Sequence, residues 1–372
     1  MSADAPAPLR VLHVDTERGW RGGERQALWL ARELARRGHM SVVAARPRGR
    51  LAAAVGAAGI RIVASAPLAP ADPVAAWRLH RAVVGGGFSV VHAHTANAVT
   101  LGALATLGTA ARLVVTRRVD FPLNRGAGTR WKYSRASAIA AVSRRVREVL
   151  IASGIESERI SVVPDGVDLE RDMAPAGQER LRMLGVRPGQ PLVVMVSALV
   201  EHKDPLTFVR AVAAARREGP PLQALLVGDG YLMDAVRAEV GALELAGTLA
   251  IAGWQDDSDA LIAAGDVVVL SSREEGQGSV LLDAMQCGKP VAATSAGGIP
   301  DVVVDDTTGL LVPPGDAAAL GRALTRLCAE PGLRQRLGTA GRTRVREFSI
   351  ERTASLTLEV YRRVLGTPAR GD

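Results

Sequence analysis

The chain has 372 residues, of which 48% are hydrophobic and 23% charged, a balance typical of a folded soluble protein. At roughly 100–200 residues per domain this length predicts two domains, and no apolar run is long enough for a membrane-spanning helix. The formal net charge is +8, and the two cysteines, Cys287 and Cys328, suit neither a disulfide framework nor a metal site, which fits a reducing cytoplasm.

The first half of the chain alternates apolar runs with helical patterns. Residues 10–15 (RVLHVD) predict a strand, and residues 24–38 predict a helix with apolar side chains at helical spacing and Gly38 as its C-cap. Such runs, separated by helices, are typical of a parallel sheet covered on both faces. The further runs lie at 39–45, 60–65, 88–94, 111–116, 136–143 and 159–168, and the further helices near 73–84, 96–107, 128–135 and 143–153.

The second half repeats this alternation after a polar stretch, residues 169–190, which we interpret as an interdomain link. The sequence therefore predicts an α/β protein of two Rossmann-like, doubly wound domains, 1–168 and 169–348, with a final helix in 349–372 that packs back on the first domain. Ligands of such sheets bind outside the carboxyl ends of the strands, so we expect a cleft between the domains. The apolar runs of this half lie at 191–199, 222–227, 248–252, 266–270 and 290–294.

Two loops at the strand ends of the second half stand out. Asp204 and Pro205 predict a helix start, which places Lys203 where anions are favoured. The stretch SSREEGQGSVLLDAMQCGKP (271–290) predicts a glycine-rich loop followed by a helix that carries Asp283. Glu275 and Asp283 could hold two sets of ligand hydroxyls, or they could be a dipole-stabilising acid and a solvated one. Glu274 is expected to be solvated.

The motifs of the whole chain, taken in order, resemble the retaining glycosyltransferases of family 4, which have the GT-B fold of two Rossmann-like domains facing across a cleft. Ser272, Glu275, Gly276, Gly278 and Asp283 match the signature that contains the paired acids of that family. Other motifs of the family match VAATSAGGIPDVV, TTGLLVPPGD, VGDG and VVPDGVD in the second half and the end of the first. In the first half they also match GWRGGERQALWLARELARRGH and VVHAH.

The resemblance implies an enzyme that uses a nucleotide-diphosphate sugar, without a bound metal or other cofactor, and a saccharide or lipid-linked acceptor of a cell-surface glycan. The implied catalytic residues are His94, beside the reacting carbon, Glu275, on the sugar hydroxyls, and Lys203, on the diphosphate. The implied donor-binding residues are Asp283 on the ribose, Gly228, Asp229, Gly253 and Trp254 near the nucleoside, Gly276, Gln277, Gly278 and Ser279 through their amides, and Gly22 and Gly23 from the first domain.

Two positions depart from the family pattern. Asp283 stands where the family has a glutamate, and Ala198 stands where it has an arginine that clamps a phosphate. Arg117 or Arg118 could replace that clamp or bind the acceptor. Glu24 could contact the acceptor, although capping its helix is the better interpretation. His13 and His80 are expected to be structural.

The segment from Arg112 to Arg147 contains ten basic residues and a single acid, Asp120. This excess predicts a solvated surface, or a patch that binds an anionic acceptor or anionic lipid. Attachment to anionic lipid implies a cytoplasmic protein with a peripheral position at the inner membrane. Two other functions stay open: a nucleotide-sugar epimerase or hydrolase on the same fold, and a basic binding protein without catalysis. Nucleic acid is not an expected partner, because the segment lacks a recognised nucleic-acid module.

Overall fold

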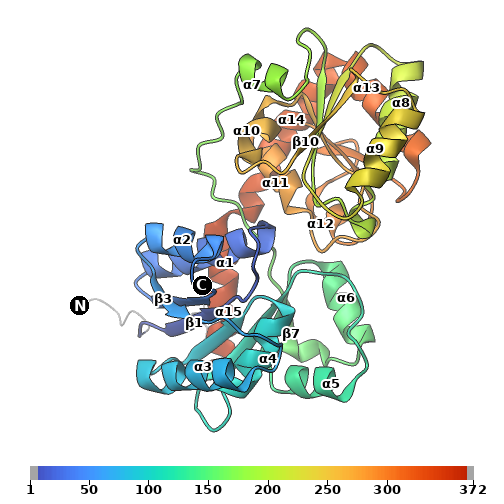
Figure 1. The fold of residues 1–372 in the computed structure, drawn as a ribbon. Helices are drawn as coiled ribbons and strands as arrows, with labels where there is room; N and C mark the ends of the chain where they lie inside the picture. Colours follow the sequence, from blue (N-terminus) through green and yellow to red (C-terminus); the bar gives the residue numbers. More distant parts are fainter. Residues whose placement is uncertain (1–6, 367–372) are drawn as a thin grey trace. The chain divides into compact units, whose positions relative to one another are not determined.

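The computed structural model describes residues 7–366; residues 1–6 and 367–372, at the outer ends of the predicted first domain and final helix, lie outside it. The chain divides into two compact units, one running up to Gly166 and resuming at Ile350, the other running from Val167 to Ser349. Each unit is built on a parallel sheet with helices on its faces (Figure 1). The predicted α/β class with two Rossmann-like domains is confirmed.

The first unit has a seven-stranded sheet in the order β3-β2-β1-β4-β5-β6-β7, and its neighbouring strands are all parallel. Its strands are β1 (Arg10–Val14), β2 (Met40–Ala45), β3 (Arg61–Ala64), β4 (Val90–Ala93), β5 (Arg112–Arg117), β6 (Ala138–Ala141) and β7 (Ile160–Val162). Its helices are α1 (Gly22–Arg36), α2 (Arg50–Ala57), α3 (Pro73–Gly86), α4 (Ala96–Ala105), α5 (Ala127–Ser134), α6 (Arg144–Ala152) and α15 (Ile350–Leu365), with a 3-10 turn, η1 (Ser157–Arg159).

Helix starts in this unit follow the side chains that precede them. Asp72 accepts hydrogen bonds from the backbone N–H groups of Val74 and Ala75, and Thr95 and Ser143 cap α4 and α6 in the same way. The predicted C-terminal glycine of α1 is also confirmed, because Gly38 has φ +83°, a conformation in which a side chain would be strained.

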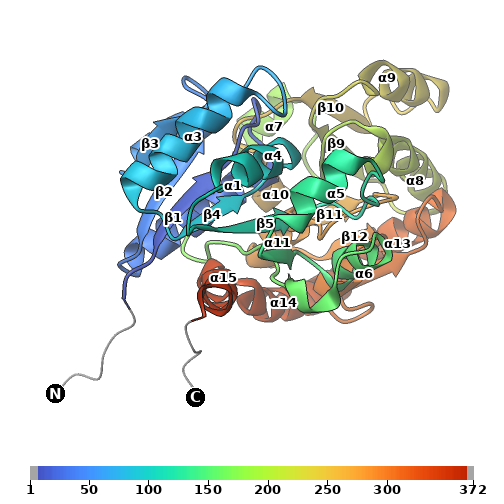
Figure 2. The same ribbon diagram turned by 90° about the horizontal axis from the view of Figure 1, so that it is seen from below.

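Alternate residues of each strand face different helix layers. Leu12 and Val14 of β1 pack with α3, α4, α5 and α6, whereas Val11 packs with α1 and α15 on the opposite face. Figure 2 shows α3, α4 and α5 along one side of this sheet. His13 lies between Leu12 and Val14 in β1, so its side chain belongs to the layer of α1 and α15.

The second unit has a six-stranded parallel sheet in the order β10-β9-β8-β11-β12-β13. Its strands are β8 (Leu192–Val196), β9 (Gln223–Val227), β10 (Leu249–Gly253), β11 (Val267–Leu270), β12 (Val291–Thr294) and β13 (Gly309–Val312). Its helices are α7 (Gln178–Met183), α8 (Pro205–Glu218), α9 (Met233–Ala242), α10 (Ser258–Ala264), α11 (Ser279–Gln286), α12 (Ile299–Val302), α13 (Ala317–Ala329) and α14 (Pro331–Arg344), with 3-10 turns η2 (Glu201–Lys203) and η3 (Val345–Phe348). The predicted link 169–190 thus contains a helix, α7.

The last helix of the chain completes the first unit. Leu358 and Tyr361 of α15 are buried with Leu30 and Leu34 of α1. Thr353 donates to the carbonyl of Pro164 at 2.9 Å, and Gln26 of α1 holds both backbone groups of Gly166. A Cβ at Gly166 would lie 2.6 Å from Thr353 Oγ1, so only glycine fits where the chain passes under α15.

Candidate functional site

The second unit gathers its predicted site residues on two loops at the carboxyl edge of the sheet. The loop after β8 ends in η2, and Asp204 then caps α8 by accepting the Thr207 N–H at 3.2 Å. Pro205 occupies the first turn of α8. Lys203 therefore lies directly before a helix N-terminus, as predicted.

The loop after β11 is tied to this first loop by several hydrogen bonds. Ser271 Oγ donates to the carbonyl of Asp204 at 2.8 Å, and the backbone N–H of Arg273 donates to the carbonyl of His202 at 2.8 Å. The Arg273 guanidinium also pairs with the Asp204 carboxylate at 2.7 Å. These contacts hold the two loops at a fixed separation, which is the arrangement that a preorganised binding site needs.

Lys203 and Glu275 form an ion pair between the two loops. The Lys203 ammonium donates to Glu275 Oε2, and Ser272 Oγ donates to the same oxygen at 3.2 Å. The Lys203 side chain is 21% exposed and that of Glu275 is 10% exposed. The pair is thus partly accessible to solvent, and the Lys203 ammonium could exchange the Glu275 carboxylate for another anion. Glu274 is exposed, as expected.

The glycine-rich loop leads directly into α11. Gly278 has φ +85° and precedes the first residue of the helix, Ser279. Gly276 and Gln277 are buried, and Gln277 is 4% exposed. The first turn of α11 has backbone N–H groups without helical partners, which favour the oxygens of an anion. The helix has eight residues and carries Asp283 on its buried side.

Asp283 is not solvated but lies in a buried ion-pair network. Its Oδ1 accepts from Arg171 at 2.7 Å, and Arg171 pairs at 2.8 Å with Asp259 Oδ2. The Asp283 side chain is 2% exposed and that of Arg171 is 15% exposed. The interpretation of Asp283 as a surface acid is therefore wrong. Arg171 was not among the predicted site residues, because it lies in the predicted link and has no local signal in the sequence.

The turns after β9 and β10 hold the other donor-binding candidates. A Cβ at Gly228 would lie 1.8 Å from the carbonyl oxygen of Ser197, so this glycine is required by the fold itself. Asp229 is exposed and accepts the N–H of Gly230 at 2.7 Å. Gly253 ends β10, and Trp254 is 46% exposed with its indole N–H donating to Asp256 at 3.0 Å.

In the first unit, the predicted residues meet at the carboxyl edge of β4 and β5. Arg118 Nε donates to both carboxylate oxygens of Asp165, at 3.0 and 2.9 Å. Its Nη1 lies 3.4 Å from His94 Nδ1. Arg117 instead donates to the carbonyl of Phe121 at 2.7 Å. Both arginines thus have partners within their own unit. His94 is 4% exposed.

Three acids, Asp15, Glu24 and Asp165, lie near Arg118. Glu24 accepts the Arg21 N–H at 2.6 Å, which confirms that it caps α1, while Gly22 and Gly23 form the first residues of that helix. Burial raises the pKa of Asp165 and of Glu24. Burial also raises the pKa of Asp15 to about 7, and its Oδ2 accepts no hydrogen bond from residues 7–366.

Asp15→Asn should stabilise the protein more at pH 8 than at pH 5. The folded pKa of Asp15 lies above its unfolded value, so the carboxyl destabilises the fold increasingly from about pH 4 to pH 7 and fully above that. A shift from 3.8 to about 7 corresponds to at most about 4 kcal/mol. Urea unfolding at both pH values measures the difference. Asp234→Asn, at an exposed carboxylate, is the control. An equal gain in stability at both pH values in Asp15→Asn contradicts the raised pKa of Asp15.

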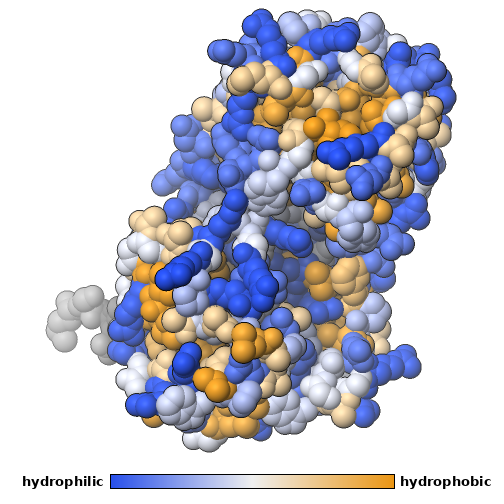
Figure 3. All heavy atoms as spheres, in the orientation of Figure 1, coloured by the Kyte–Doolittle hydropathy of each residue, from blue (hydrophilic) through white to orange (hydrophobic). Residues whose placement is uncertain are grey.

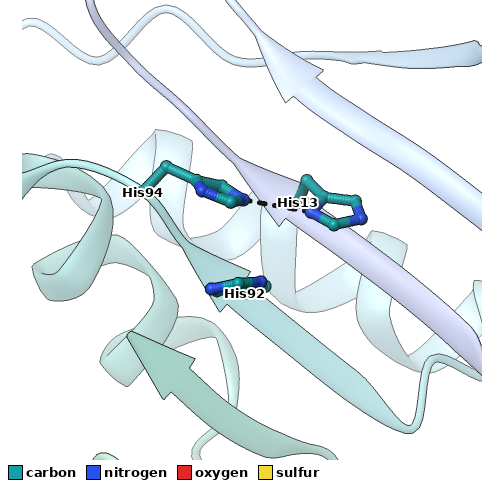
Figure 4. Close-up of side chains that lie close together, drawn as sticks. All are labelled: His13, His92 and His94. Carbon is teal, nitrogen blue, oxygen red and sulfur yellow. Dashed lines mark hydrogen bonds between the residues drawn. The ribbon is translucent and has the colours of Figure 1, made fainter. Parts of the chain in front are cut away.

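Figure 4 shows His13, His92 and His94, whose nitrogens lie close enough to suggest a metal site. His13 Nδ1 is 3.0 Å from His94 Nε2, so these two rings are hydrogen-bonded to each other. His92 has its Nδ1 2.6 Å from Tyr361 Oη and its Nε2 2.7 Å from Thr116 Oγ1. Since a metal ligand needs a free lone pair, the residues fit a hydrogen-bonded layer better than a metal centre.

Two family models and several curated proteins match this chain. Residues 178–344 match the model described as glycosyl transferases group 1, and residues 20–171 match that of glycosyltransferase family 4. A 2-deoxystreptamine glucosyltransferase of Streptomyces kanamyceticus is 35% identical over 67% of this chain and 66% of its own length. A D-inositol 3-phosphate glycosyltransferase of Salinispora arenicola is 35% identical over 55% of this chain and 49% of its own. The matches span about half to two-thirds of these relatives.

Solved structures share the fold of the chain at low sequence identity. Anabaena HepE, in complex with UDP and glucose, superposes with a TM-score of 0.82 at 20% identity, covering 94% of this chain and 98% of its own. A glycosyltransferase from Rickettsia africae ESF-5 gives 0.82 at 22% identity, covering 97% and 100%. Within residues 7–366, none of the helices has the length and apolar character needed to span a bilayer.

Proposed function

The chain belongs to glycosyltransferase family 4, and on that basis we propose that it transfers a sugar from a nucleotide-diphosphate sugar to a saccharide or lipid-linked acceptor. The observation that carries the proposal is the Lys203–Glu275 pair, which links the two loops at the carboxyl edge of the second sheet. Such an edge is where parallel α/β sheets bind nucleotides.

The pair suits both halves of a nucleotide sugar. The diphosphate leaves with growing negative charge, which Lys203 and the backbone amides at the start of α11 would stabilise. As Lys203 turns to the diphosphate, Glu275 loses its counter-ion and becomes available to accept hydrogen bonds from sugar hydroxyls. Ser272 would keep the carboxylate in place during this exchange.

We propose that the transfer retains the configuration of the sugar and requires no metal. The acceptor hydroxyl forms its bond to the anomeric carbon on the side from which the diphosphate departs. The bond from that carbon to the phosphate oxygen breaks, and the phosphate takes the hydroxyl proton. Lys203 supplies the positive charge, so turnover should persist in EDTA. Nuclear magnetic resonance of the product distinguishes retention from inversion.

A ligand screen tests the donor class. The full chain is mixed with UDP, GDP and ADP and with their glucose, mannose and N-acetylglucosamine derivatives, and its melting temperature is measured. A nucleotide present at 100 times its dissociation constant should stabilise the protein by about 2.7 kcal/mol. Lys203→Ala should remove most of this gain, whereas Glu274→Ala should keep it. No stabilisation by any nucleotide contradicts the proposal.

We further propose that the enzyme works on cell-surface glycans, held peripherally at an anionic membrane by the layer of α3, α5 and α6. Arg125 and Arg130 are exposed here, and Trp131 and Trp77 are 39% and 56% exposed. Figure 3 shows apolar side chains among hydrophilic ones on this unit. Arg112 is exposed too, but it begins β5 whereas α5 follows the other end of that strand, so it lies outside this layer. Arginine and tryptophan together suit a lipid headgroup region.

Liposome sedimentation tests the membrane proposal. The chain should pellet with vesicles containing phosphatidylglycerol at low salt and stay in solution with phosphatidylcholine alone. Arg125→Glu/Arg130→Glu should abolish pelleting. Arg182→Glu/Arg322→Glu changes the net charge equally at exposed positions of the second unit, and it should pellet as the wild type does. Equal loss in both double variants points to net charge alone and contradicts a defined surface.

A further inference from the structure

The histidine layer of the first unit contains more than the one histidine assigned to the site. His13 of β1 is fully buried, and its ring lies 5.3 Å from that of His94, centroid to centroid, at an interplanar angle of 24°. The His94 N–H donates to the carbonyl of Val14, the neighbour of His13, at 3.0 Å. The end of β1 thus holds both the backbone and the ring of His94.

The charged neighbours fix the direction of the protons in this layer. A guanidinium has only donors, and Arg118 Nη1 lies 3.4 Å from His94 Nδ1. This contact therefore requires a lone pair on His94 Nδ1. The proton of a neutral His94 ring must then be on Nε2, which lies 3.0 Å from His13 Nδ1. His13 Nδ1 accepts the hydrogen bond from this N–H, so the single proton of the neutral His13 ring is on Nε2, an atom that meets no partner among the described residues.

Both ends of this chain of bonds are held firmly. Asp165 binds Arg118 through both carboxylate oxygens, so the guanidinium cannot turn away without breaking both contacts to a buried acid. Burial keeps both rings neutral: it lowers the pKa of His13 to about 3 and that of His94 well below its usual range. The other groups near His94 are His92 and Arg118, and both also lower the pKa of its ring.

We propose that His13 is a positioning residue that holds His94 as the neutral Nε2–H tautomer. His94 then presents a lone pair at Nδ1 on the side of Arg118, and its ring can accept a hydrogen bond there but cannot donate one. If the chain is the transferase proposed above, on which this consequence rests, a hydroxyl of the bound sugar or acceptor could bond to the His94 ring only by donating to Nδ1 in place of Arg118. His13, expected to be merely structural, would set that preference.

Nitrogen-15 spectra of histidine-labelled full-length protein test the tautomer directly. The two neutral tautomers and the imidazolium have different ring-nitrogen shifts, and a His94→Gln variant assigns the His94 signal among the six histidines. We expect Nε2–H for His94 in the wild type at pH 7.5. An Nδ1–H tautomer or a protonated ring overturns the proposal, and this result does not depend on any enzymatic activity.

Three variants separate positioning from packing. His13→Leu keeps an apolar volume but offers no acceptor, so the Nε2–H signal of His94 should be lost or averaged. His13→Asn places an oxygen near the former Nδ1 and should restore the signal. Tyr361→Phe removes the partner of His92 and leaves the His13–His94 bond, so it should keep the wild-type His94 signal. An unchanged His94 signal in His13→Leu overturns the proposal.

Turnover is the second readout, once a donor and acceptor are known. His13→Leu should lower kcat on the order of 100-fold with little change in the KM for the donor, since a mispositioned group affects the reacting complex most. His13→Asn should recover most of the loss. A rise in KM together with a fall in kcat, without recovery in His13→Asn, indicates general damage and contradicts positioning. If neither the wild type nor any variant turns over, the nitrogen-15 spectra alone still decide whether His13 sets the tautomer of His94.

Discussion

Asp283→Ala should lower the free energy of unfolding by about 3–5 kcal/mol, because it removes a buried carboxylate that pairs with the largely shielded Arg171 guanidinium. Urea unfolding measures this loss. Glu239→Ala breaks the exposed Arg210–Glu239 pair and should cost no more than about 1 kcal/mol. Asp283→Glu keeps the charge that the family pattern has at this position and should retain most of the stability.

A double variant shows whether Arg171 is the cause. Arg171→Met/Asp283→Leu removes the cation together with the anion, so it should be more stable than Asp283→Ala alone. Nucleotide affinity must then be measured well below the unfolding transition of each variant. If Asp283→Ala is as stable as Glu239→Ala, the buried pair is not the principal role of this acid. The proposal that Asp283 binds the ribose would then remain as the reason for its burial.

Glu275→Ala should reduce kcat by about 10²–10³-fold while changing the affinity for a nucleoside diphosphate little. The carboxylate would act on the sugar, where charge and geometry change in the transition state, and not on the nucleotide. Lys203→Ala should lower both quantities, because the cation would contact the diphosphate itself. Steady-state kinetics and calorimetric titration with the nucleoside diphosphate measure the two effects.

The neighbouring acid supplies the control for this prediction. Glu274 lies in the same loop but is exposed, so Glu274→Ala should keep wild-type kinetics. A similar loss of kcat in Glu274→Ala would point to a disturbed loop. In Lys203→Ala/Glu275→Ala the two losses should not add, since each single change already breaks the same ion pair. Strict additivity would show that Lys203 and Glu275 act separately.

The sequence predicted those features of the site that depend on near neighbours. Asp204 and Pro205 define the start of α8 within one turn, and this start places Lys203. The glycine at position 278 and the apolar spacing behind it likewise define α11. Such local signals are sufficient because caps and helical periodicity involve residues three or four positions apart.

Pairs of buried polar side chains were not predictable in the same way. Arg171 and Asp283 are separated by 112 positions, and His13 and His94 by 81. Their pairing depends on which strands become neighbours in the sheet and on which side chains lose water there. Asp15 was missed for this reason, since an aspartate at a strand end has the same appearance in a sequence whether its oxygen is solvated or sealed from water.

The position of α15 also bears on how the chain folds during its synthesis. The second unit is one uninterrupted segment, from Val167 to Ser349, and it can form as soon as that segment has left the ribosome. The first unit still lacks α15 at that moment, and with it Tyr361, the buried hydroxyl beside His92. The unit translated first is therefore completed last, and a stop codon before Ile350 would leave an apolar face of the nascent chain uncovered.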